Sequence, residues 1–512
     1  MELKTSQAVI TANEPTGNVL QEQGIELDYV LPDYYPDVCK LIKCWVNPAV
    51  INETLNGSRL SYELKAEVRI LYCSENSNVL QCVTQILRFP KSAELPAGEN
   101  LTVDILPECD YVNCRAVSRR RLDVRGAVTI RMKTHSVRQQ EALTDIPEKE
   151  IQLRKIPVQY PAVQLHTVKS IIVSEELDLG TAKPPVLHVV RCDARAVEQS
   201  QKLISGKLMV QGNLQLQLLY ACESEGDGSL EPMAFRIPYS QLIDIDGLEE
   251  GDECRTQIEI VSCETKPIAN AEGDVRQLKC EAELRVSCVA VRMATESLVN
   301  DAFSTEHPYQ CEYMELVSSS TPALFSEMLT KTVNLSCTDE ELDCVYDAWC
   351  EIHNVTTAIE SGILTISGML NNQVLVREQS GMPRLLEREE PFEHHFPVMD
   401  LENQDLLQVN VTAENCSYTL NSTTEVALKA ELRMEGTVTH CRTVKVLSDI
   451  SIQEDETHPR QYALKLYFGK KNEPIWEIAK RCYTSVEAIM EENDLTQETL
   501  TDDEMLLIPI VG

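Results

Sequence analysis

Three stretches of strict apolar–polar alternation, far apart in the chain, constrain the fold most. They cover residues 122–132, 278–290 and 426–434, and in each of them every second residue is apolar. A period of two places successive side chains on opposite faces of a strand. Each stretch therefore predicts a β-strand with one buried face, which needs a second layer of structure to cover it.

The same order of features precedes each of these strands. A strand runs into a chain reversal, a returning strand ends at a proline, and an acidic or glycine-containing loop leads to a short alternating strand. The first strands are predicted at residues 64–72, 214–220 and 369–376, and the reversals at 74–78, 223–229 and 379–381. The returning strands end at Pro90, Pro238 and Pro397, and the short strands cover 101–105, 255–260 and 407–411. The reversals carry turn-forming residues.

The spacing of unrelated markers indicates that these segments are copies of one unit. Pro90, Pro238 and Pro397 are 148 and 159 residues apart. Three cysteines, Cys44, Cys192 and Cys350, are 148 and 158 residues apart. Two markers with nearly the same intervals predict a triplicated module, and each module is expected to be an antiparallel β-sandwich or barrel with short hairpins.

The length of 512 residues suits three or four domains of ~150 residues. We predict a mostly β, multi-domain protein: three repeated antiparallel β-sandwich or barrel-like modules followed by a small βααβ domain. The expected parts are an N-terminal tail (1–15), module 1 (16–145), a linker (146–165), module 2 (166–315), a more divergent module 3 (316–455) and the C-terminal domain (456–512).

Charge and cysteine content limit the function classes. The chain has 81 acidic against 46 basic residues, a net charge of −35, which disfavours nucleic acid as a partner and also simply keeps a large protein soluble. None of the 19 cysteines forms a C-x-x-C pair, so no zinc site is expected. The start of the chain lacks a signal-peptide pattern, and no stretch reaches the ~20 apolar residues of a membrane span.

These patterns predict reduced thiols, of which Cys280 and Cys288 lie on a buried strand face and act as small apolar side chains. Crosslinking of thiols in a late, oxidising assembly is the alternative. No P-loop, G-x-S-x-G or H-E-x-x-H motif occurs, so no catalytic residue and no cofactor are predicted. Acid pairs such as Glu249 and Glu250 would suit an enzyme, but acid-rich loops produce such pairs by chance.

The last fifty residues have a different pattern. Residues 462–466 alternate as a short strand, and Asn472 is expected to cap a helix that has Pro474 in its first turn. A capping box of Thr484 and Glu487 predicts a second helix, and residues 506–508 predict a closing strand. The order is β-α-α-β.

This region resembles the LysM family. The resemblance rests on Tyr462, Trp476, Ile478, Ala479, Ala488, Ile489, Asn493, Leu495 and residues 507–509. It implies binding of N-acetylglucosamine-containing glycans through the loop after the first strand and the loop after the second helix. The family's first loop commonly carries Gly-Asp-Thr or Gly-Asp-Ser, whereas this chain has residues 471–474, KNEP, in that place. That departure disfavours sugar and fits a protein partner.

Residues 31–37, LPDYYPD, and residues 233–238 with 247–252 resemble the SPOCS modules of SipL-type spore coat morphogenetic proteins. The resemblance implies tandem SPOCS modules and a LysM domain that engages a polymerising coat morphogenetic ATPase. It also implies other spore coat proteins as partners, and a place in the mother-cell cytoplasm at the forespore surface.

The first hypothesis is therefore a non-enzymatic scaffold in spore coat assembly. The alternative is a peptidoglycan- or chitin-type glycan-binding protein of the cortex or wall. Trp476 is favoured as a core residue over an exposed interface anchor. The residues expected to bind a partner are Lys470, Lys471, Asn472, Glu473, Trp476, Asn493, Asp494 and Leu495.

Overall fold

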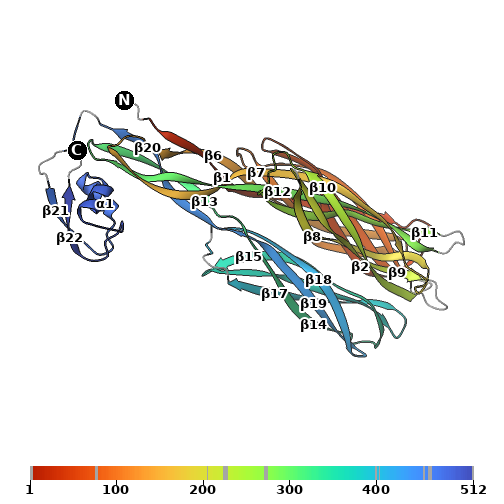
Figure 1. The fold of residues 1–512 in the computed structure, drawn as a ribbon. Coiled ribbons are helices and arrows are strands. Elements are labelled where there is room, and N and C mark those ends of the chain that lie inside the picture. The colour runs from red at the N-terminus through yellow and green to blue at the C-terminus, as the bar shows by residue number, and fades with distance from the viewer. Residues whose placement is uncertain are drawn as a thin grey trace.

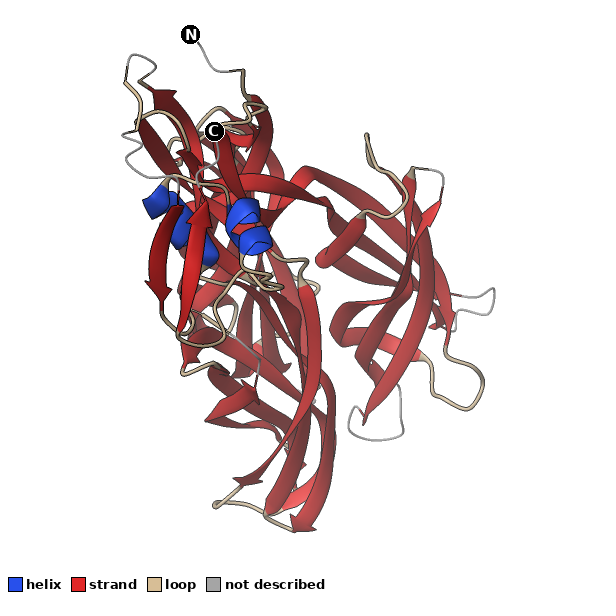
Figure 2. Cartoon of the chain, turned by 60° about the vertical axis from the view of Figure 1, so that its left-hand side comes forward, coloured by secondary structure: helices blue, strands red, loops and turns tan. Residues whose placement is uncertain are grey.

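The computed structural model describes residues 4–74, 79–204, 206–222, 229–269, 275–397, 401–402, 404–453, 456–458 and 464–509. Within these residues the chain consists almost entirely of antiparallel strands, and its two short helices both lie in the C-terminal domain (Figures 1 and 2). The predicted mostly β, multi-domain fold class is confirmed.

The first module is a sandwich of two three-stranded sheets. One sheet has the order β2-β3-β4 and the other β1-β6-β5. The central strands β3 and β6 face each other, and their alternate apolar residues, such as Leu64 and Val124, are fully buried in one core. The strands are β1 (Ser6–Val30), β2 (Val38–Asn56), β3 (Arg59–Ser74), β4 (Leu80–Glu94), β5 (Thr102–Ser118) and β6 (Arg121–Asp145).

Two further modules repeat this strand order and pairing. Their sheets are β8-β9-β10 with β7-β12-β11, and β15-β16-β17 with β14-β19-β18. The three strongly alternating stretches of the sequence form the central strands β6, β12 and β19. The second module has β7 (Ile151–Asp178), β8 (Val186–Ile204), β9 (Lys207–Cys222), β10 (Ser229–Asp244), β11 (Glu253–Ala269) and β12 (Val275–Ser304). The third has β14 (Ala323–Ser336), β15 (Leu342–Glu360), β16 (Ile363–Glu378), β17 (Pro383–Pro397), β18 (Leu406–Ser422) and β19 (Glu425–Thr439).

Several predicted boundaries are wrong for the same physical reason. Residues 151–165 of the predicted linker (146–165) form the first half of β7, where Pro157 and Pro161 lie in a strand. Similarly, β4 continues past Pro90 and β10 past Pro238. All three are edge strands, in which one side needs no ladder hydrogen bonds, so proline is tolerated. Only β17 ends at its proline, Pro397.

The predicted N-terminal tail, residues 1–15, also belongs largely to a strand, because β1 begins at Ser6. The boundary expected between residues 315 and 316 falls inside strand β13 (Tyr309–Ser319). Of the predicted reversals, residues 75–78 and 223–228 lie outside the described residues, whereas 379–381 form a turn between β16 and β17.

The three modules contact one another in a closed triangle. Lys65 of the first module donates to the carbonyl oxygen of Val261 in the second, 2.9 Å away. Arg195 of the second module reaches the carbonyl of Ala413 in the third at 2.9 Å. An apolar cluster contains buried residues of all three modules: Leu71, Val79, Leu80, Val190, Leu219, Ala221, Leu230, Trp349 and Leu375.

Ribbons from the three modules continue beyond them as a stalk. The stalk consists of the outer ends of the β1–β6 and β7–β12 pairs together with the β13–β20 pair, where β20 is Cys441–Ile452. Figure 1 shows these ribbons running away from the modules toward the C-terminal domain. The stalk has its own core, formed by Ile10, Ala142, Val158, Tyr160, Leu298, Leu316 and Val446.

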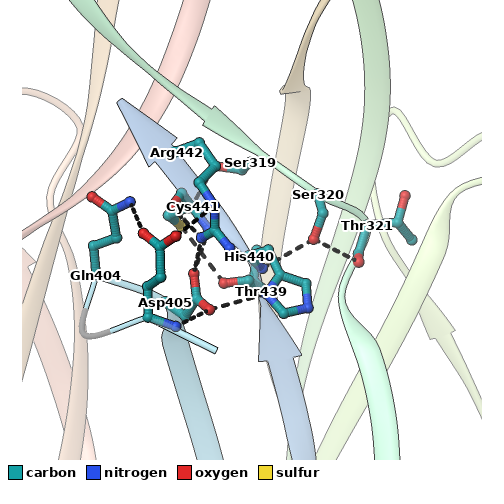
Figure 3. A network of polar contacts seen from close by, with 10 residues as sticks. Ser319, Ser320, Thr321, Gln404, Asp405, Thr439, His440, Cys441 and Arg442 are labelled. Atoms are coloured by element: carbon teal, nitrogen blue, oxygen red, sulfur yellow. Dashed lines mark hydrogen bonds and ion pairs between the residues drawn. The ribbon is translucent and has the colours of Figure 1, made fainter. Parts of the chain in front are cut away.

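The β13–β20 ribbon is interrupted where it meets the third module. Between β19 and β20 the chain bends at His440, whose amide donates to the Ser320 hydroxyl at 3.0 Å. The carboxylate of Asp405 accepts hydrogen bonds from His440 at 3.0 Å, from the Cys441 amide at 2.9 Å and from Arg442 at 2.8 Å (Figure 3). This network fixes the bend between the third module and the stalk.

The C-terminal domain has the predicted βααβ order in its described part. It contains β21 (Leu464–Gly469), α1 (Ile475–Cys482), α2 (Val486–Glu492) and β22 (Glu504–Pro509). The two strands form an antiparallel pair on which the helices pack (Figure 2). Tyr462, which the sequence places at the start of the domain, lies outside the described residues.

Candidate partner-binding surface

Both helices of the C-terminal domain start differently from the prediction. Asn472 has a positive φ of 65° and does not cap α1; the N-cap is Pro474, without a side-chain hydrogen bond. The cap of α2 is Ser485, whose hydroxyl accepts from the Ala488 amide at 3.2 Å. Thr484 instead donates to the carbonyl of Pro509 at 2.7 Å. The predicted capping box is therefore wrong by one residue, and Thr484 holds the closing strand instead.

Asn493, predicted as a binding residue, makes hydrogen bonds within the domain. Its side-chain nitrogen donates to the carbonyls of Ile489 and Leu507, both at 2.7 Å, and its oxygen accepts from the Leu507 amide at 2.7 Å. These bonds satisfy the end of α2 and the inner side of β22. The Asn493 side chain is thereby committed to holding helix and strand together.

Trp476 is buried, as the sequence favoured, but against the stalk. Only 9% of the residue is exposed. Its ring lies edge-on to Phe303 at the end of β12, with centroids 5.0 Å apart. Its indole nitrogen donates to a carboxylate oxygen of Asp301 at 2.8 Å. In this structure Trp476 thus joins two parts of the same chain.

Asp301 is the centre of a polar cluster beneath α1. Lys480 donates to its two oxygens at 2.7 and 2.9 Å, and the Tyr313 hydroxyl donates at 2.9 Å. Burial opposes ionisation of this carboxyl, but the hydrogen bonds from Lys480, Trp476 and Tyr313 outweigh it and lower the pKa of Asp301. The ionised carboxylate therefore anchors one face of α1 to the stalk.

The predicted first loop remains largely accessible. Lys470, Lys471 and Asn472 are exposed. Glu473 is half-buried, because its carboxylate accepts from the Tyr467 hydroxyl at 2.7 Å and from the Lys470 amide at 3.0 Å. The first loop thus offers two lysines and an asparagine, and Glu473 shapes it.

In the predicted second loop, Asp494 is exposed, while Leu495 is partly buried against the core of the domain. The structure thus leaves four of the eight predicted residues exposed on the domain surface: Lys470, Lys471, Asn472 and Asp494.

A feature that the sequence analysis missed is an apolar patch on the outer face of β21 and β22. We call Leu466, Phe468 and Met505 the outer patch; they are 54%, 74% and 56% exposed. Phe468 pairs with Met505 across the two strands, so the side chains lie on one face. The signal in the sequence is that residues 464–468 are apolar at four of five positions, more than one buried face requires. Contiguous exposed apolar side chains mark interaction sites.

Among the described residues, no group of three or more His, Cys, Asp or Glu side chains is placed to hold a metal ion. Neither described helix is long and apolar enough to cross a membrane.

The fold and surfaces define a class: a multi-module β protein whose small terminal domain is docked on a stalk and exposes a mixed basic and apolar surface. Residues 185–268, which cover nearly all of β8 to β11, match the family model of the SipL, SPOCS domain. Searches of characterised proteins and of solved structures gave no match. The match relates the second module to a sporulation coat family.

Proposed function

We propose that the protein is a non-enzymatic scaffold in spore coat assembly, and that its LysM-like C-terminal domain docks onto a polymerising coat morphogenetic ATPase. The observation that carries the proposal is the SPOCS match in the second module. The first and third modules have the same strand order and pairing, so we propose them as further SPOCS domains. The proposed site of action is the mother-cell cytoplasm at the forespore surface, where other coat proteins would contact the modules.

The position of the C-terminal domain supports a docking role. It lies at the end of the stalk, away from the three modules (Figure 1), and it is fixed there by Asp301 and Phe303. The outer patch and the two exposed lysines, Lys470 and Lys471, lie on parts of the domain that are not buried against the stalk. A rigid head with an apolar patch beside cationic side chains suits a protein surface that carries apolar and acidic groups.

The test is the affinity of the full chain for the purified coat ATPase. The double variant Phe468→Ser/Met505→Ser removes apolar area from the outer patch, and we expect at least tenfold weaker binding, because central apolar anchors carry most interface energy. The charge-reversal variant Lys470→Glu/Lys471→Glu should slow association and weaken binding at low salt. The control is Leu324→Ser, which alters an 83% exposed residue of β14 in the third module.

Point variants are preferable to deletion of the C-terminal domain. Deletion would uncover Phe303 and leave the buried Asp301 without two of its partners, Trp476 and Lys480. In sporulating cells, fluorescent fusions of both double variants should lose their forespore localisation while the Leu324→Ser fusion keeps it. Normal localisation of both would contradict the proposal, and strong sedimentation of the wild-type chain with purified peptidoglycan would favour the glycan-binding alternative.

A further inference from the structure

Each of the three modules brings a cysteine of its second strand next to a cysteine of its fifth strand. The pairs are Cys44 with Cys114, Cys192 with Cys263, and Cys350 with Cys416. All six residues are half-buried, whereas Cys280 and Cys288 are fully buried in the core. Recurrence of a thiol pair between the same two strands in every module separates these six cysteines from the others.

The strands that carry the pairs are edge strands of opposite sheets. In the first module β2 is an edge of one sheet and β5 an edge of the other, and they lie alongside each other without belonging to one ladder. The same holds for β8 with β11 and for β15 with β18. Backbone hydrogen bonds join the two sheets at one end of this side, from the Val38 amide to the Arg119 carbonyl at 2.8 Å and from the Leu342 amide to the Thr423 carbonyl at 2.7 Å. A covalent bond farther along the strands would tie the sheets together at a second point.

The sulfur atoms are close enough to react. The sulfurs of Cys350 and Cys416 are 2.9 Å apart. Cys44 and Cys114 pack against the same core cluster and line the same cleft. Cys192 and Cys263 pack against one core cluster on neighbouring strands, and Cys263 has a further thiol neighbour, Cys280, at 4.0 Å. A disulfide needs sulfurs ~2.05 Å apart, so small rotations of the side chains suffice for Cys350 and Cys416 in place of a backbone rearrangement.

In the first and third modules, one thiol of each pair has a lowered pKa. The hydrogen bond from Cys350 lowers the pKa of Cys416, and the hydrogen bond from Cys44 likewise lowers the pKa of Cys114. The same hydrogen bonds, together with burial, raise the pKa of Cys350 and of Cys44. In such a pair the thiol with the lower pKa is the nucleophile, because the thiolate is the reactive form.

Oxidants can reach at least one pair from solvent. A cleft of about 350 Å³ is lined by Cys44 and Cys114. Lys43 and Asn113 lie beside them in its wall. Because both sulfur-bearing residues line this cleft, a small oxidant can approach them without opening the sandwich.

We propose that these three pairs are modification sites that form intramolecular disulfides across the sheet edges when the protein meets a peroxide oxidant. The thiolate of Cys416 attacks one oxygen of hydrogen peroxide, the O–O bond breaks and a sulfenic acid forms. The departing hydroxide takes up the proton that Cys416 had released and becomes water. The sulfur of Cys350 then attacks the sulfenic sulfur, the S–S bond forms, the S–O bond breaks, and the hydroxyl leaves as water with the Cys350 proton. Two thiols and one peroxide thus yield one disulfide and two waters.

The expected effect is stabilisation of all three sandwiches without crosslinking of separate chains. Each bridge closes a loop of more than sixty residues in sequence, and long loops gain most from closure of the unfolded chain. The inference does not depend on the proposed function, because it concerns the chemistry of the modules alone.

The experiment treats the reduced full-length protein with hydrogen peroxide, followed by alkylation, non-reducing digestion and mass spectrometry of the linked peptides. We expect Cys44–Cys114, Cys192–Cys263 and Cys350–Cys416 peptides from a protein that stays monomeric on a non-reducing gel. The melting temperature should rise by several degrees and return on reduction. A Cys263–Cys280 link in place of Cys192–Cys263 would overturn the assignment in the second module.

Matched variants separate a specific bridge from a general effect. Cys350→Ala should abolish the third link and lower only that part of the thermal gain, while the links of the other modules form as before. Cys288→Ala, at a fully buried cysteine of β12, should leave all three links intact. The proposal is overturned if the six cysteines stay reduced, or if the links match the random set formed by urea-unfolded protein.

Discussion

The indole nitrogen of Trp476 donates a hydrogen bond to a carboxylate oxygen of Asp301, 2.8 Å away and 175 residues earlier in the chain. This contact joins the first helix of the C-terminal domain to strand β12 of the stalk. It orients the domain so that its outer patch stays uncovered. A hydrogen bond outside the proposed docking surface therefore determines which face of the domain a partner can reach.

Replacing Asp301 by asparagine should release the domain. The variant removes the charge that pairs with Lys480 and weakens the hydrogen bond from Trp476. Breaking a partly buried ion pair of this kind costs about 2–3 kcal/mol. We expect a red shift of tryptophan emission and an earlier urea transition of the C-terminal domain.

The matched control for that variant is Asp145→Asn. Asp145 also forms an ion pair in the stalk, with Lys155 at 2.8 Å, but both side chains are substantially exposed. An exposed pair contributes only about 0–1 kcal/mol. Equal effects of the two variants would show that Asp301 is not a specific anchor.

Docking should also weaken in acid. The pKa of Asp301 is lower in the folded protein than its ordinary value, so its contribution to stability is fully present above the unfolded pKa of ~3.9. The contribution is lost as the pH falls from that value through the folded pKa. Tryptophan emission followed from pH 6 to pH 2 should report release of the domain in this acid range. In Asp301→Asn this acid-dependent step should be missing, and a step that persists unchanged would assign it to other carboxylates.

The period-two alternation was sufficient to predict the triplicated sandwiches, because strands such as β6 and β19 bury every second residue in their own module. The stalk was not predictable in the same way. Its core joins residues such as Ile10, Val158 and Leu316, which come from three ribbons, and no local pattern tells which ribbons meet. Most of the predicted linker is a strand instead, since β7 is an edge strand and accepts Pro157 and Pro161.

The candidate surfaces, like the fold, were predictable from the sequence only in part. The exposed loop containing Lys470 and Lys471 followed from the βααβ order. Asp301 did not, because nothing in the sequence distinguishes one acid among 81 Asp and Glu. The cysteine pairs were half visible: Cys44, Cys192 and Cys350 mark the repeat, but their partners lie on strands that are not paired with theirs by a ladder.

Gly212 in the central strand β9 should be intolerant of any side chain. A Cβ there would lie 2.2 Å from the carbonyl oxygen of Val197 and 2.4 Å from the Tyr239 hydroxyl. Because Val197 contributes a backbone atom, Gly212→Ala must displace a neighbouring strand, and we expect a loss of about 1–3 kcal/mol in the free energy of unfolding. Gly24→Ala is the control, since a Cβ at Gly24 meets nothing within 4 Å. Similar urea midpoints for both variants would argue against close packing at Gly212.

The junction between the second and third modules should depend on Arg191. Its guanidinium donates to Asp347 at 2.6 Å and lies 3.8 Å from the ring centroid of Trp349. Burial raises the pKa of Asp347 despite this cation and a hydrogen bond from the Ala348 amide at 2.9 Å, so Arg191 is the main charge that compensates the buried carboxylate. Arg191→Ala should therefore destabilise the protein by about 3 kcal/mol, measured by urea unfolding at neutral pH. The loss should shrink as the pH falls, because a carboxyl with a raised folded pKa destabilises the protein only as the pH rises and it ionises.

Two controls decide whether the unpaired charge of Asp347 causes that loss. Adding Asp347→Asn to Arg191→Ala removes the buried charge and should recover a large part of the stability. Arg59→Ala alters a pair with Glu94 in which both side chains are mostly exposed, at 65% and 73%, and should change the free energy of unfolding by less than about 0.5 kcal/mol. If the double variant is no more stable than Arg191→Ala alone, the loss comes from the missing contact with Trp349, because that contact is absent from both variants.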